Sequence, residues 1–366
     1  MHPINKERLI STFMELASIS SPSWKEHEVL DYITDRFTAL GIPYKKHACS
    51  DSFNLLATAR GTSEKKPILL SAHTDTVVPC DSIKPVINGN RIMSDGNSIL
   101  GSDDKAAIAM FIEALEIARE TKLPHGPVEI LLSCAEELGL LGIKNFDMSL
   151  IKSKRAFVFD SGGRVGKIVI KAPYHSSMEI TIEGKAAHAG MEPEKGISAI
   201  SVLAAIIAAL PNGRIDDVTT MNVGIISGGR ATNIVAEEAY CKLEVRSIDK
   251  KKMLMVEKTI RETISDLTKK AGARAVIHRE LEYPGFSISE ESDIAKYTCK
   301  ALTNIGIKPE FEISGGGSDT NILNRAGIKA INLSCGMQKV HTTGEYIDIK
   351  DLVNGTRLVL SLIEMA

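Results

Sequence analysis

The sequence lacks the features of a membrane-spanning, secreted or nucleic-acid-binding protein. Its longest apolar stretch, residues 197–210, is interrupted by two serines and ends at Pro211, short of the roughly 20 residues that a transmembrane helix requires. The N-terminal segment has neither the apolar core nor the small-residue cleavage site of a signal peptide. Lysine plus arginine (44) nearly balance aspartate plus glutamate (46), so charge indicates neither nucleic acid nor anionic lipid as a partner.

Cysteine is scarce and irregularly spaced. The six cysteines form no CxxC pair, and a chain of this size needs no disulfides to stabilise its core. We therefore expect free thiols and a cytoplasmic location. With 366 residues, 43% of them hydrophobic, the chain has an ordinary globular composition and enough length for two domains.

Short apolar segments predict a buried β-sheet in the first and last parts of the chain. Segments of this length between turn residues are typical of strands covered on both faces, and they occur at residues 54–59, 67–73, 128–134, 155–160 and 329–335. Residues 104–122 have the length and Ala/Leu/Glu content of a helix, and residues 23–26 resemble a capping box that opens a helix ending before Gly41. The alternation predicts an α/β domain with a mainly parallel mixed sheet and helices on both faces.

Residues 174–285 have a different pattern, which predicts a second domain inserted into the first. The order is strand, helix, two strands, helix, strand, as in a ferredoxin-like α+β module, with helices at 197–210 and 250–271. The sheet of the first domain resumes afterwards. The first domain is therefore expected to comprise residues 1–173 and 286–366.

Histidine and acidic residues follow several of the predicted strands. His73 and Asp75 follow one strand, and Glu136 and Glu137 follow another. In an open α/β sheet, ligands bind beyond the carboxyl ends of the strands, so we expect these side chains at one edge. The same edge is expected to receive three further side chains, those of Asp103, Asp160 and His341.

This set of residues predicts a pair of divalent metal ions. Imidazole and carboxylate groups suit zinc, and also cobalt or manganese. Five ligands with one bridging carboxylate would give each of two metals three protein ligands: His73, Asp103, Glu137, Asp160 and His341. Glu136 is then free to act as general base, and Asp75 could hold the far ring nitrogen of His73. Each motif alone is also explained by a helix cap or a hydrogen-bonded pair, so it is the combination that indicates a metal centre.

Nine segments resemble the co-catalytic zinc exopeptidase family, which includes peptidase T, glutamate carboxypeptidase and the aminoacylases. They are SAHTDTV, GSDDKAAIA, CAEELGLLG, FVFDSGG, GKAAHAGMEPEKGISAI, GGRATNIV, LEVRS, SGGGSDTNIL and VHTTGEYI. The likeness covers essentially the whole chain and is strongest to peptidase T-like proteins. It implies that His73 and Asp160 hold one metal and that Glu137 and His341 hold the other. It also implies that Asp103 bridges the metals and is followed by a cis peptide to Asp104.

The resemblance further implies that the inserted domain is a lid and dimerisation domain. His188 of the AHAG segment would reach the substrate on lid closure, often from the partner subunit of a homodimer. Asn233 and Arg246 would bind polar or carboxylate groups of the substrate, and Gly316 would offer a backbone amide. The alternatives are a solvent-exposed histidine, a surface ion pair and a simple turn.

The expected function is hydrolysis of peptide bonds in small peptides (tripeptides or dipeptides) by metal-activated water. Aspartate at position 160 is more typical of the peptidases of this family than of its deacylases. The segment VHTTGEYI differs from its counterpart in authentic tripeptidases, which leaves the peptide length open. An N-acyl amino acid amidohydrolase would use the same centre, and a non-catalytic binding protein is an alternative from another class, although the intact Glu136 argues against it. The sequence indicates neither the native metal nor the end of the peptide that is trimmed.

Overall fold

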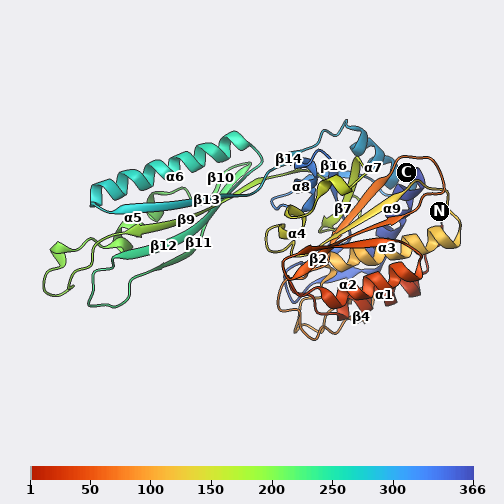
Figure 1. The fold of residues 1–366 in the computed structure, drawn as a ribbon, viewed down its shortest axis with the longest axis horizontal. Coiled ribbons are helices and arrows are strands. Elements are labelled where there is room, and N and C mark those ends of the chain that lie inside the picture. The colour runs from red at the N-terminus through yellow and green to blue at the C-terminus, as the bar shows by residue number, and fades with distance from the viewer. Residues whose placement is uncertain (1) are drawn as a thin grey trace. The chain divides into compact units, whose positions relative to one another are not determined.

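A computed structural model describes residues 2–366. The chain forms two compact units (Figure 1). The first comprises residues 2–171, Ser287–Ser314 and Ser318–Ala366, and the second comprises Ala172–Phe286 and Gly315–Gly317. The sequence analysis placed the inserted segment at residues 174–285 and did not anticipate that Gly315–Gly317 belongs with it.

A nine-stranded sheet forms the centre of the first unit, in the order β1-β2-β6-β3-β7-β16-β8-β14 with β15 paired to β8. Strands β6, β3, β7 and β16 run parallel to their neighbours within this group, whereas β1, β2 and β8 add antiparallel pairs. The predicted mainly parallel mixed sheet is therefore confirmed. The strands are β1 (Tyr44–Cys49), β2 (Ser52–Ala59), β3 (Ile68–His73), β6 (Val128–Ser133), β7 (Arg155–Ser161), β8 (Lys167–Ala172), β14 (Phe286–Ser287), β15 (Glu310–Ile313) and β16 (Lys329–Ser334).

Helices cover both faces of this sheet. Strands β3 and β6 are buried at every position, as their apolar sequences predict. Helix α3 packs against α1, α9 and the sheet, and α8 packs against β7 and β16. Asp319 of α8 is bonded to Ser133, whereas the neighbouring Leu132 belongs to the core shared with α3, so α8 and α3 lie on opposite faces. The helices are α1 (Lys6–Ser18), α2 (His27–Ala39), α3 (Ser102–Glu120), α4 (Leu141–Lys144), α7 (Asp293–Asn304), α8 (Asp319–Arg325) and α9 (Ile349–Met365).

The predicted capping box before α2 is wrong. The helix begins at His27, and its N-cap residue Glu26 makes no side-chain capping hydrogen bond. Ser23 instead donates to Asp75 Oδ2 at 2.7 Å, and Glu26 Oε1 accepts the backbone N–H of Ala135 at 2.9 Å. Both side chains hydrogen-bond to loops that are distant in sequence, and a local sequence pattern cannot predict such contacts.

A small second sheet in the first unit has the order β17-β18-β5-β4. Gln338 pairs with Tyr346, so β17 (Met337–Gln338) and β18 (Tyr346–Asp348) form a hairpin around residues 339–345. Strand β18 also pairs with β5 (Arg91–Met93), which pairs with β4 (Val86–Asn88). The hairpin fixes the loop that carries His341.

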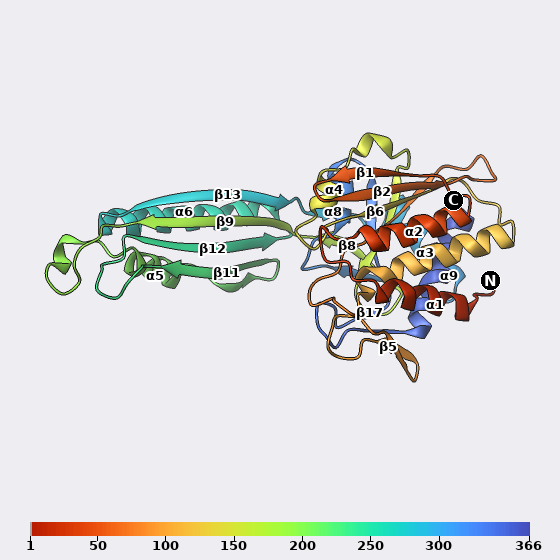
Figure 2. The same cartoon turned by 60° about the horizontal axis from the view of Figure 1, so that its bottom comes forward.

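The second unit has an antiparallel sheet in the order β10-β11-β12-β9-β13 with two helices packed on it (Figure 2). Apart from the added short strand β10, the elements follow the predicted order. They are β9 (Tyr174–Glu183), α5 (Ala199–Ala209), β10 (Gly213–Asp216), β11 (Thr219–Gly228), β12 (Glu238–Ser247), α6 (Lys250–Ala271) and β13 (Arg274–Tyr283). The unit has its own apolar core between sheet and helices.

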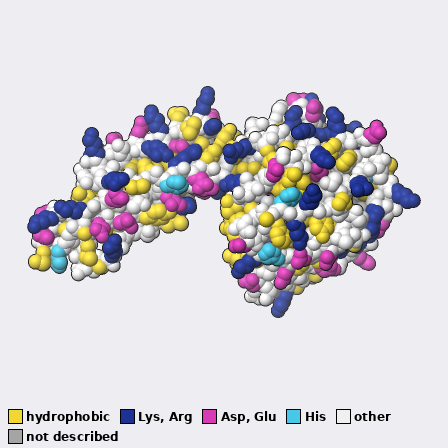
Figure 3. All heavy atoms as spheres, viewed as in Figure 1, with side chains coloured by type: hydrophobic (Ala, Val, Ile, Leu, Met, Phe, Trp, Pro, Cys, Tyr) yellow, Lys and Arg dark blue, Asp and Glu magenta, His cyan; other side chains and the backbone are white. Residues whose placement is uncertain are grey.

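The distribution of charge on the surface and the lengths of the helices agree with what the composition predicts. In the space-filling view, basic and acidic side chains are interspersed on the visible surface of each unit (Figure 3), as the balanced charge predicts. Among residues 2–366, no helix combines the length and the apolar character needed to cross a bilayer.

Candidate metal centre

Five segments bring the predicted metal ligands together at the carboxyl edge of the parallel strands. His73 ends β3, Asp160 lies near the end of β7 and Glu137 follows β6. Asp103 lies in the first turn of α3 and His341 in the β17–β18 loop. Because the carboxyl ends of parallel strands meet at one edge, residues that are far apart in sequence become neighbours here.

The ligand atoms form two groups that share one carboxylate. His73, Asp103 and Asp160 form one group, and Asp103, Glu137 and His341 form the other, with the N and O atoms of each group within 4.8 Å of one another. Asp103 Oδ1 lies 3.0 Å from His73 Nε2, and Asp103 Oδ2 lies 3.3 Å from His341 Nε2. His341 Nε2 is also 3.0 Å from Glu137 Oε1. A carboxylate whose two oxygens face different histidines has the arrangement of a bridging ligand.

Asp75 supports this arrangement in two ways. Nδ1 of His73 lies 2.9 Å from the carbonyl oxygen of Asp75 and 3.3 Å from its Oδ1. Asp75 Oδ1 also accepts the N–H of Glu136 at 2.9 Å, and Oδ2 accepts the N–H of Glu137 at 3.1 Å. Asp75 is fully buried, so it fixes the orientation of the histidine and of the Glu136–Glu137 backbone together.

Glu345 is a buried site residue that the sequence analysis missed. Its carboxylate accepts three hydrogen bonds, from the N–H of Gly101 at 2.8 Å, Ser102 Oγ at 2.5 Å and the N–H of Asp103 at 3.0 Å. The peptide between Asp103 and Asp104 is cis, as the family resemblance implied. The sequence could have indicated Glu345, because this glutamate lies in the same short segment as the candidate ligand His341.

Asn332 and Asp319 were also missed. Asn332 Oδ1 accepts the N–H of Asp160 at 2.9 Å, and its Nδ2 donates to the Asp160 carbonyl at 2.6 Å. Asp319 Oδ2 accepts from Ser133 Oγ at 2.6 Å, whereas its Oδ1 is buried without a hydrogen-bond partner among residues 2–366. An asparagine inside an otherwise apolar strand was the signal for the first of these contacts.

The carboxyl groups of the site have shifted pKa values, which are raised by burial and by neighbouring acids and lowered by hydrogen bonds to histidine. Burial, together with the nearby charge of Asp160, raises the pKa of Glu136 well above its usual range. Burial and the charge of Asp103 likewise raise the pKa of Asp160. Burial also disfavours the ionised form of Asp103, but hydrogen bonds to His341 and His73 outweigh it and lower the pKa of Asp103. Buried acids of raised pKa hold protons that a divalent cation can replace.

The pKa values of the two histidines are raised by their hydrogen bonds to carboxylates. Burial by itself lowers the pKa of His73, but hydrogen bonds to Asp103 and Asp75 raise it well above its usual value. Hydrogen bonds to Asp103 and Glu137 raise the pKa of His341 to about 10. His341 also has a left-handed φ of 61°, an uncommon conformation for a non-glycine residue that occurs preferentially at functional sites.

His188 and Asn233 lie together in the second unit. His188 pairs with Ile234 in an isolated β-bridge, and the carbonyl of Asn233 accepts the N–H of Ala189 at 3.0 Å. His188 Nδ1 accepts the N–H groups of Gly190 and Met191 at 3.2 and 3.1 Å. An accepting Nδ1 places the proton of a neutral imidazole on Nε2, so the exposed His188 ring presents an Nε2–H donor.

Arg246 and Gly316 lie in another part of the second unit. Arg246 forms a bidentate ion pair with Glu244, with Nε–Oε1 and Nη2–Oε2 distances of 3.0 Å, and Glu244 Oε2 lies 3.0 Å from His175 Nε2. Arg246 Nη1 lies 3.5 Å from the carbonyl oxygen of Gly315, in the segment that contains Gly316. The guanidinium is therefore already engaged by a carboxylate of its own chain.

The second unit does not bring His188 and Arg246 together. Arg246 is opposite His175 at the start of β9, whereas His188 follows the far end of this ten-residue strand. At roughly 3.3 Å per residue, the two ends of β9 are about 30 Å apart. Figures 1 and 2 show the loop after β9 and the C-terminal end of β12 at opposite ends of the unit. The His188 and Arg246 side chains of one copy of the unit therefore cannot both contact the same small peptide.

Two family models match parts of this chain. Residues 54–194 match the model described as peptidase family M28, which spans the part that holds four of the five predicted ligands. Residues 173–272 match the model described as a peptidase dimerisation domain, which corresponds to most of the second unit.

Relatives match nearly the full length of the chain. Uncharacterized protein YqjE of Bacillus subtilis is 37% identical over 368 residues, covering 99% of both chains. Among solved structures, the aminopeptidase PepT from Bacillus cereus is 38% identical with a TM-score of 0.92, covering 99% of this chain and 98% of that one. A tripeptidase from Staphylococcus aureus is 35% identical with a TM-score of 0.95 and the same coverage. The chain therefore belongs to the M20 family of peptidases and is a peptidase T-like hydrolase.

Proposed function

We propose that this protein is a di-metal exopeptidase that hydrolyses tripeptides or dipeptides with metal-activated water and a glutamate general base. The observation that carries the proposal is the carboxylate of Asp103, whose two oxygens face His73 and His341 at 3.0 and 3.3 Å. Glu136 lies beside this arrangement, with its backbone held by Asp75. The names of the PepT aminopeptidase and the tripeptidase support a peptide substrate trimmed from its amino end.

The donor set fits two divalent ions. We assign His73 and Asp160 to one ion, Glu137 and His341 to the other, and Asp103 to both. Two imidazoles with carboxylates suit zinc first, and cobalt or manganese as substitutes. When bound, the ions would supply a water of lowered pKa and an electrophile for the carbonyl oxygen of the substrate. The buried acids of raised pKa support this assignment, since a cation would relieve their mutual repulsion.

Glu136 is proposed as the general base. It is 8% exposed, so it is largely shielded from water but still reaches the surface of the site. Burial raises its pKa, which suits a group that takes a proton from water and then delivers it to the leaving amine. Glu136 also lies in a third cluster with His73 and Glu137, so its role as base rather than ligand requires a test.

The substrate is proposed to contact residues of two subunits. The Nε2–H of His188 would donate to the carbonyl oxygen of the scissile bond, where charge develops during attack. Because Arg246 lies at the other end of the same unit, His188 would come from the partner of a homodimer and Arg246 from the chain that holds the metals. Asn233 would act beside His188, and Gly316 would lie beside Arg246. The match to a peptidase dimerisation domain supports the homodimer.

Arg246 would bind the terminal carboxylate of the substrate while still paired with Glu244. An arginine presents five N–H donors in a planar fork, and two of its nitrogens already contact Glu244. The third nitrogen, Nη1, lies 3.5 Å from the Gly315 carbonyl oxygen. A cytoplasmic location is also proposed, in keeping with the six free cysteines.

A metal analysis combined with a peptide panel tests the proposed function. We expect two metal ions per chain, together with hydrolysis of Ala-Ala-Ala and release of free alanine from its amino end. The N-acetylated tripeptide should be cleaved poorly, whereas N-acetylalanine tests the amidohydrolase alternative. Faster release of acetate from N-acetylalanine than of alanine from the tripeptide would overturn the peptidase proposal.

A further inference from the structure

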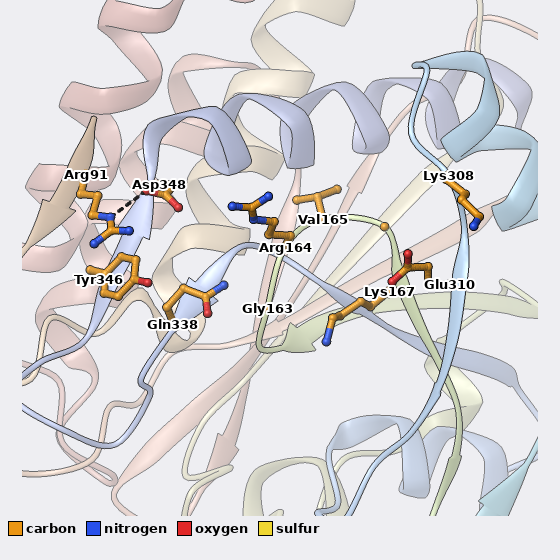
Figure 4. Close-up of a pocket in the computed structure, with 11 residues that line it drawn as sticks. Arg91, Gly163, Arg164, Val165, Lys167, Lys308, Glu310, Gln338, Tyr346 and Asp348 are labelled. Carbon is orange, nitrogen blue, oxygen red and sulfur yellow. Dashed lines mark hydrogen bonds and ion pairs between the residues drawn. The ribbon is translucent and has the colours of Figure 1, made fainter. Parts of the chain in front are cut away.

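A cavity in the first unit is lined by basic residues and by none of the proposed metal ligands (Figure 4). It has a volume of about 530 Å³, within the range of small-molecule sites. Four cations line it, contributed by three separate parts of the chain: Arg91 from β5, Arg164 from the β7–β8 turn with Lys167 at the start of β8, and Lys308 from the segment before β15. Two acids also line it, Glu310 and Asp348. The walls therefore carry an excess of two positive charges, although the whole chain has a net charge of −2.

The floor of the cavity is a turn that is anchored at each residue from 163 to 167. The N–H of Gly163 donates to the Met337 carbonyl at 2.8 Å, and the N–H of Val165 donates to Asp351 Oδ1 at 3.3 Å. Three further bonds fix the turn: Ser334 Oγ to the Arg164 carbonyl at 2.7 Å, the N–H of Glu310 to the Gly166 carbonyl at 2.9 Å, and the N–H of Lys167 to Ser334 Oγ at 3.1 Å. The backbone that carries Arg164 and Lys167 is thus fixed by its own contacts.

Gly166 lets this turn approach the segment of Lys308 closely. Its φ is 131°, and an added Cβ would lie 3.0 Å from Ile307 Cγ2 and 3.1 Å from the Lys308 carbonyl oxygen. A side chain at this position would therefore be strained and would push the two basic segments apart. The close approach brings Lys308 to the same cavity as Arg164 and Lys167.

The four cations differ in how far they are neutralised. Arg91 Nε is 3.0 Å from Asp348 Oδ1, and its guanidinium stacks 4.2 Å over the ring of Tyr346. Lys167 Nζ is 2.5 Å from Glu312 Oε1. The side chains of Arg164 and Lys308 have no hydrogen-bond or ion-pair partner among residues 2–366. Arg164 does act electrostatically on the nearby Asp351 carboxylate, but its N–H donors and those of Lys308 are not taken up by a hydrogen bond within the described residues, so both are available to an incoming anion.

We propose that this cavity is a binding site for a small oxyanion, a phosphate or carboxylate group on a metabolite. The Arg164 guanidinium would bind two anion oxygens with its parallel N–H donors, and Lys308 would add a point charge from the opposite wall. Arg91 would contribute through its terminal nitrogens, since only its Nε is bonded to Asp348. Glu310 and Asp348 restrict the ligand to one that places its anionic group near Arg164 and Lys308, with uncharged atoms elsewhere.

The site is separate from the metal centre but lies next to two segments that carry candidate metal ligands. Gln338 and Tyr346 in its wall are the paired residues at the base of the hairpin that carries His341. Gly163 in its floor lies shortly after Asp160 on the β7–β8 connection. Binding at this site does not depend on peptide hydrolysis, so it can be tested separately from the proposed activity.

Calorimetric titration of the metal-loaded protein with inorganic phosphate, and separately with succinate, tests the proposal at low ionic strength. We expect saturable binding of at least one of the two anions, weakened by added sodium chloride. Arg164→Gln should weaken binding tenfold or more, and Lys308→Gln should weaken it by a smaller factor. Binding of phosphate alone would identify a phosphorylated ligand, and binding of succinate alone would identify a carboxylate ligand.

Lys66→Gln is the matched control, because Lys66 is exposed and lies outside this cavity. It should leave anion binding unchanged. The proposal is overturned if neither anion binds, or if binding survives both Arg164→Gln and Lys308→Gln. It is also overturned if a bound anion is displaced by Ala-Ala-Ala added to Glu136→Gln protein, because that result would place the anion at the metal centre.

Discussion

The Nε2 atom of His341 lies 3.3 Å from Oδ2 of Asp103, and the other oxygen of that carboxylate faces His73. No local pattern in the sequence joins these residues, since each belongs to a separate segment. Their meeting depends on the parallel sheet for His73 and on the β17–β18 hairpin for His341. Glu345, from the same hairpin loop, holds the backbone of Asp103, so the two segments position each other.

Glu136→Gln should abolish turnover without removing the metals. The substitution keeps the size of the side chain but removes the proton acceptor, and general base catalysis typically contributes about 10²–10⁴-fold to the rate. Metal content per chain, measured alongside kcat, should equal that of the parent protein. Glu64→Gln, at an exposed position, is the matched control. Activity close to that of the parent would show that another group takes the proton.

Glu345→Gln should weaken both the fold and the metal site. The carboxylate accepts three hydrogen bonds, whereas an amide has one acceptor oxygen and adds two donors. Leaving a buried polar group unsatisfied costs about 1–3 kcal/mol, and loss of a contact behind a metal ligand typically lowers metal affinity about 10–100-fold. Thermal unfolding and competitive metal titration measure the two effects. Unchanged metal affinity would mean that Asp103 is positioned without Glu345.

Metal binding should release protons at pH 7. In the metal-free protein the pKa of His341 is raised to about 10 by Asp103 and Glu137, and that of His73 is raised as well. The His341 ring is therefore protonated at pH 7, whereas metal ligation requires neutral imidazole. Calorimetry in two buffers of different ionisation enthalpy should show proton release, with metal affinity increasing as the pH rises. An affinity that is flat between about pH 6 and 8 would contradict the raised values.

The same shift predicts how the metal-free protein responds to alkali. A histidine whose pKa is higher in the folded state binds its proton more tightly there, so it stabilises the fold at pH values below its unfolded pKa. For His341 this contribution is complete below about 6.5 and is lost as the pH rises through about 10. Urea denaturation of the metal-free protein should show a lower free energy of unfolding at pH 9 than at pH 6. His341→Gln should reduce this difference.

Removal of the metals should inactivate the enzyme and lower its melting temperature. Asp103, Glu137 and Asp160 are crowded around two histidines, and a ligand that binds only the folded state stabilises it in proportion to the logarithm of its concentration. Dialysis against a chelator followed by zinc, cobalt or manganese should restore activity to different extents. Full activity after complete metal removal, verified by elemental analysis, would exclude the proposed mechanism.

Mixing two inactive variants tests whether His188 acts across a dimer. A heterodimer of His188→Gln and Glu136→Gln chains has one site with both residues intact if His188 comes from the partner. Complete random exchange should then restore about one quarter of the parent activity. Size-exclusion chromatography with light scattering verifies the dimer. Absence of recovery despite subunit exchange would place His188 and Glu136 of one site in the same chain.

The strands and the residues that gather at the candidate metal centre were predictable from the sequence for different reasons. Strands β3 and β6 are continuous apolar runs because both of their faces are buried, and burial of this kind leaves a direct trace in composition. His73 and Glu137 were recognisable because polar residues of ligand type follow such runs. For Arg246 the sequence analysis offered a surface ion pair as an alternative without naming a partner, and the structure pairs it with Glu244, two residues away on the same face of the strand.

The prediction of a capping box before α2 was wrong because it assumed that residues close together in sequence bond to each other. Ser23 and Glu26 have the right spacing, but their side chains bind Asp75 and the backbone of Ala135. The roles of Glu345 and Asn332 were hidden for the same reason, since each hydrogen-bonds to a residue on a distant segment. The cavity lined by Arg164 and Lys308 had no sequence signal, because its cations come from separate segments.

The sequence alone determined the α/β pattern with helices on both faces of the sheet, the inserted α+β module and the types of residue available at the strand ends, because burial and periodicity appear in short stretches of the sequence. The tertiary structure alone decided that Asp103 lies between two histidines, that Asp75 and Glu345 hold the ligand backbones, and that His188 and Arg246 lie at opposite ends of their unit. Those facts depend on distances between segments, which are set by packing of the whole sheet and not by any stretch of neighbouring residues.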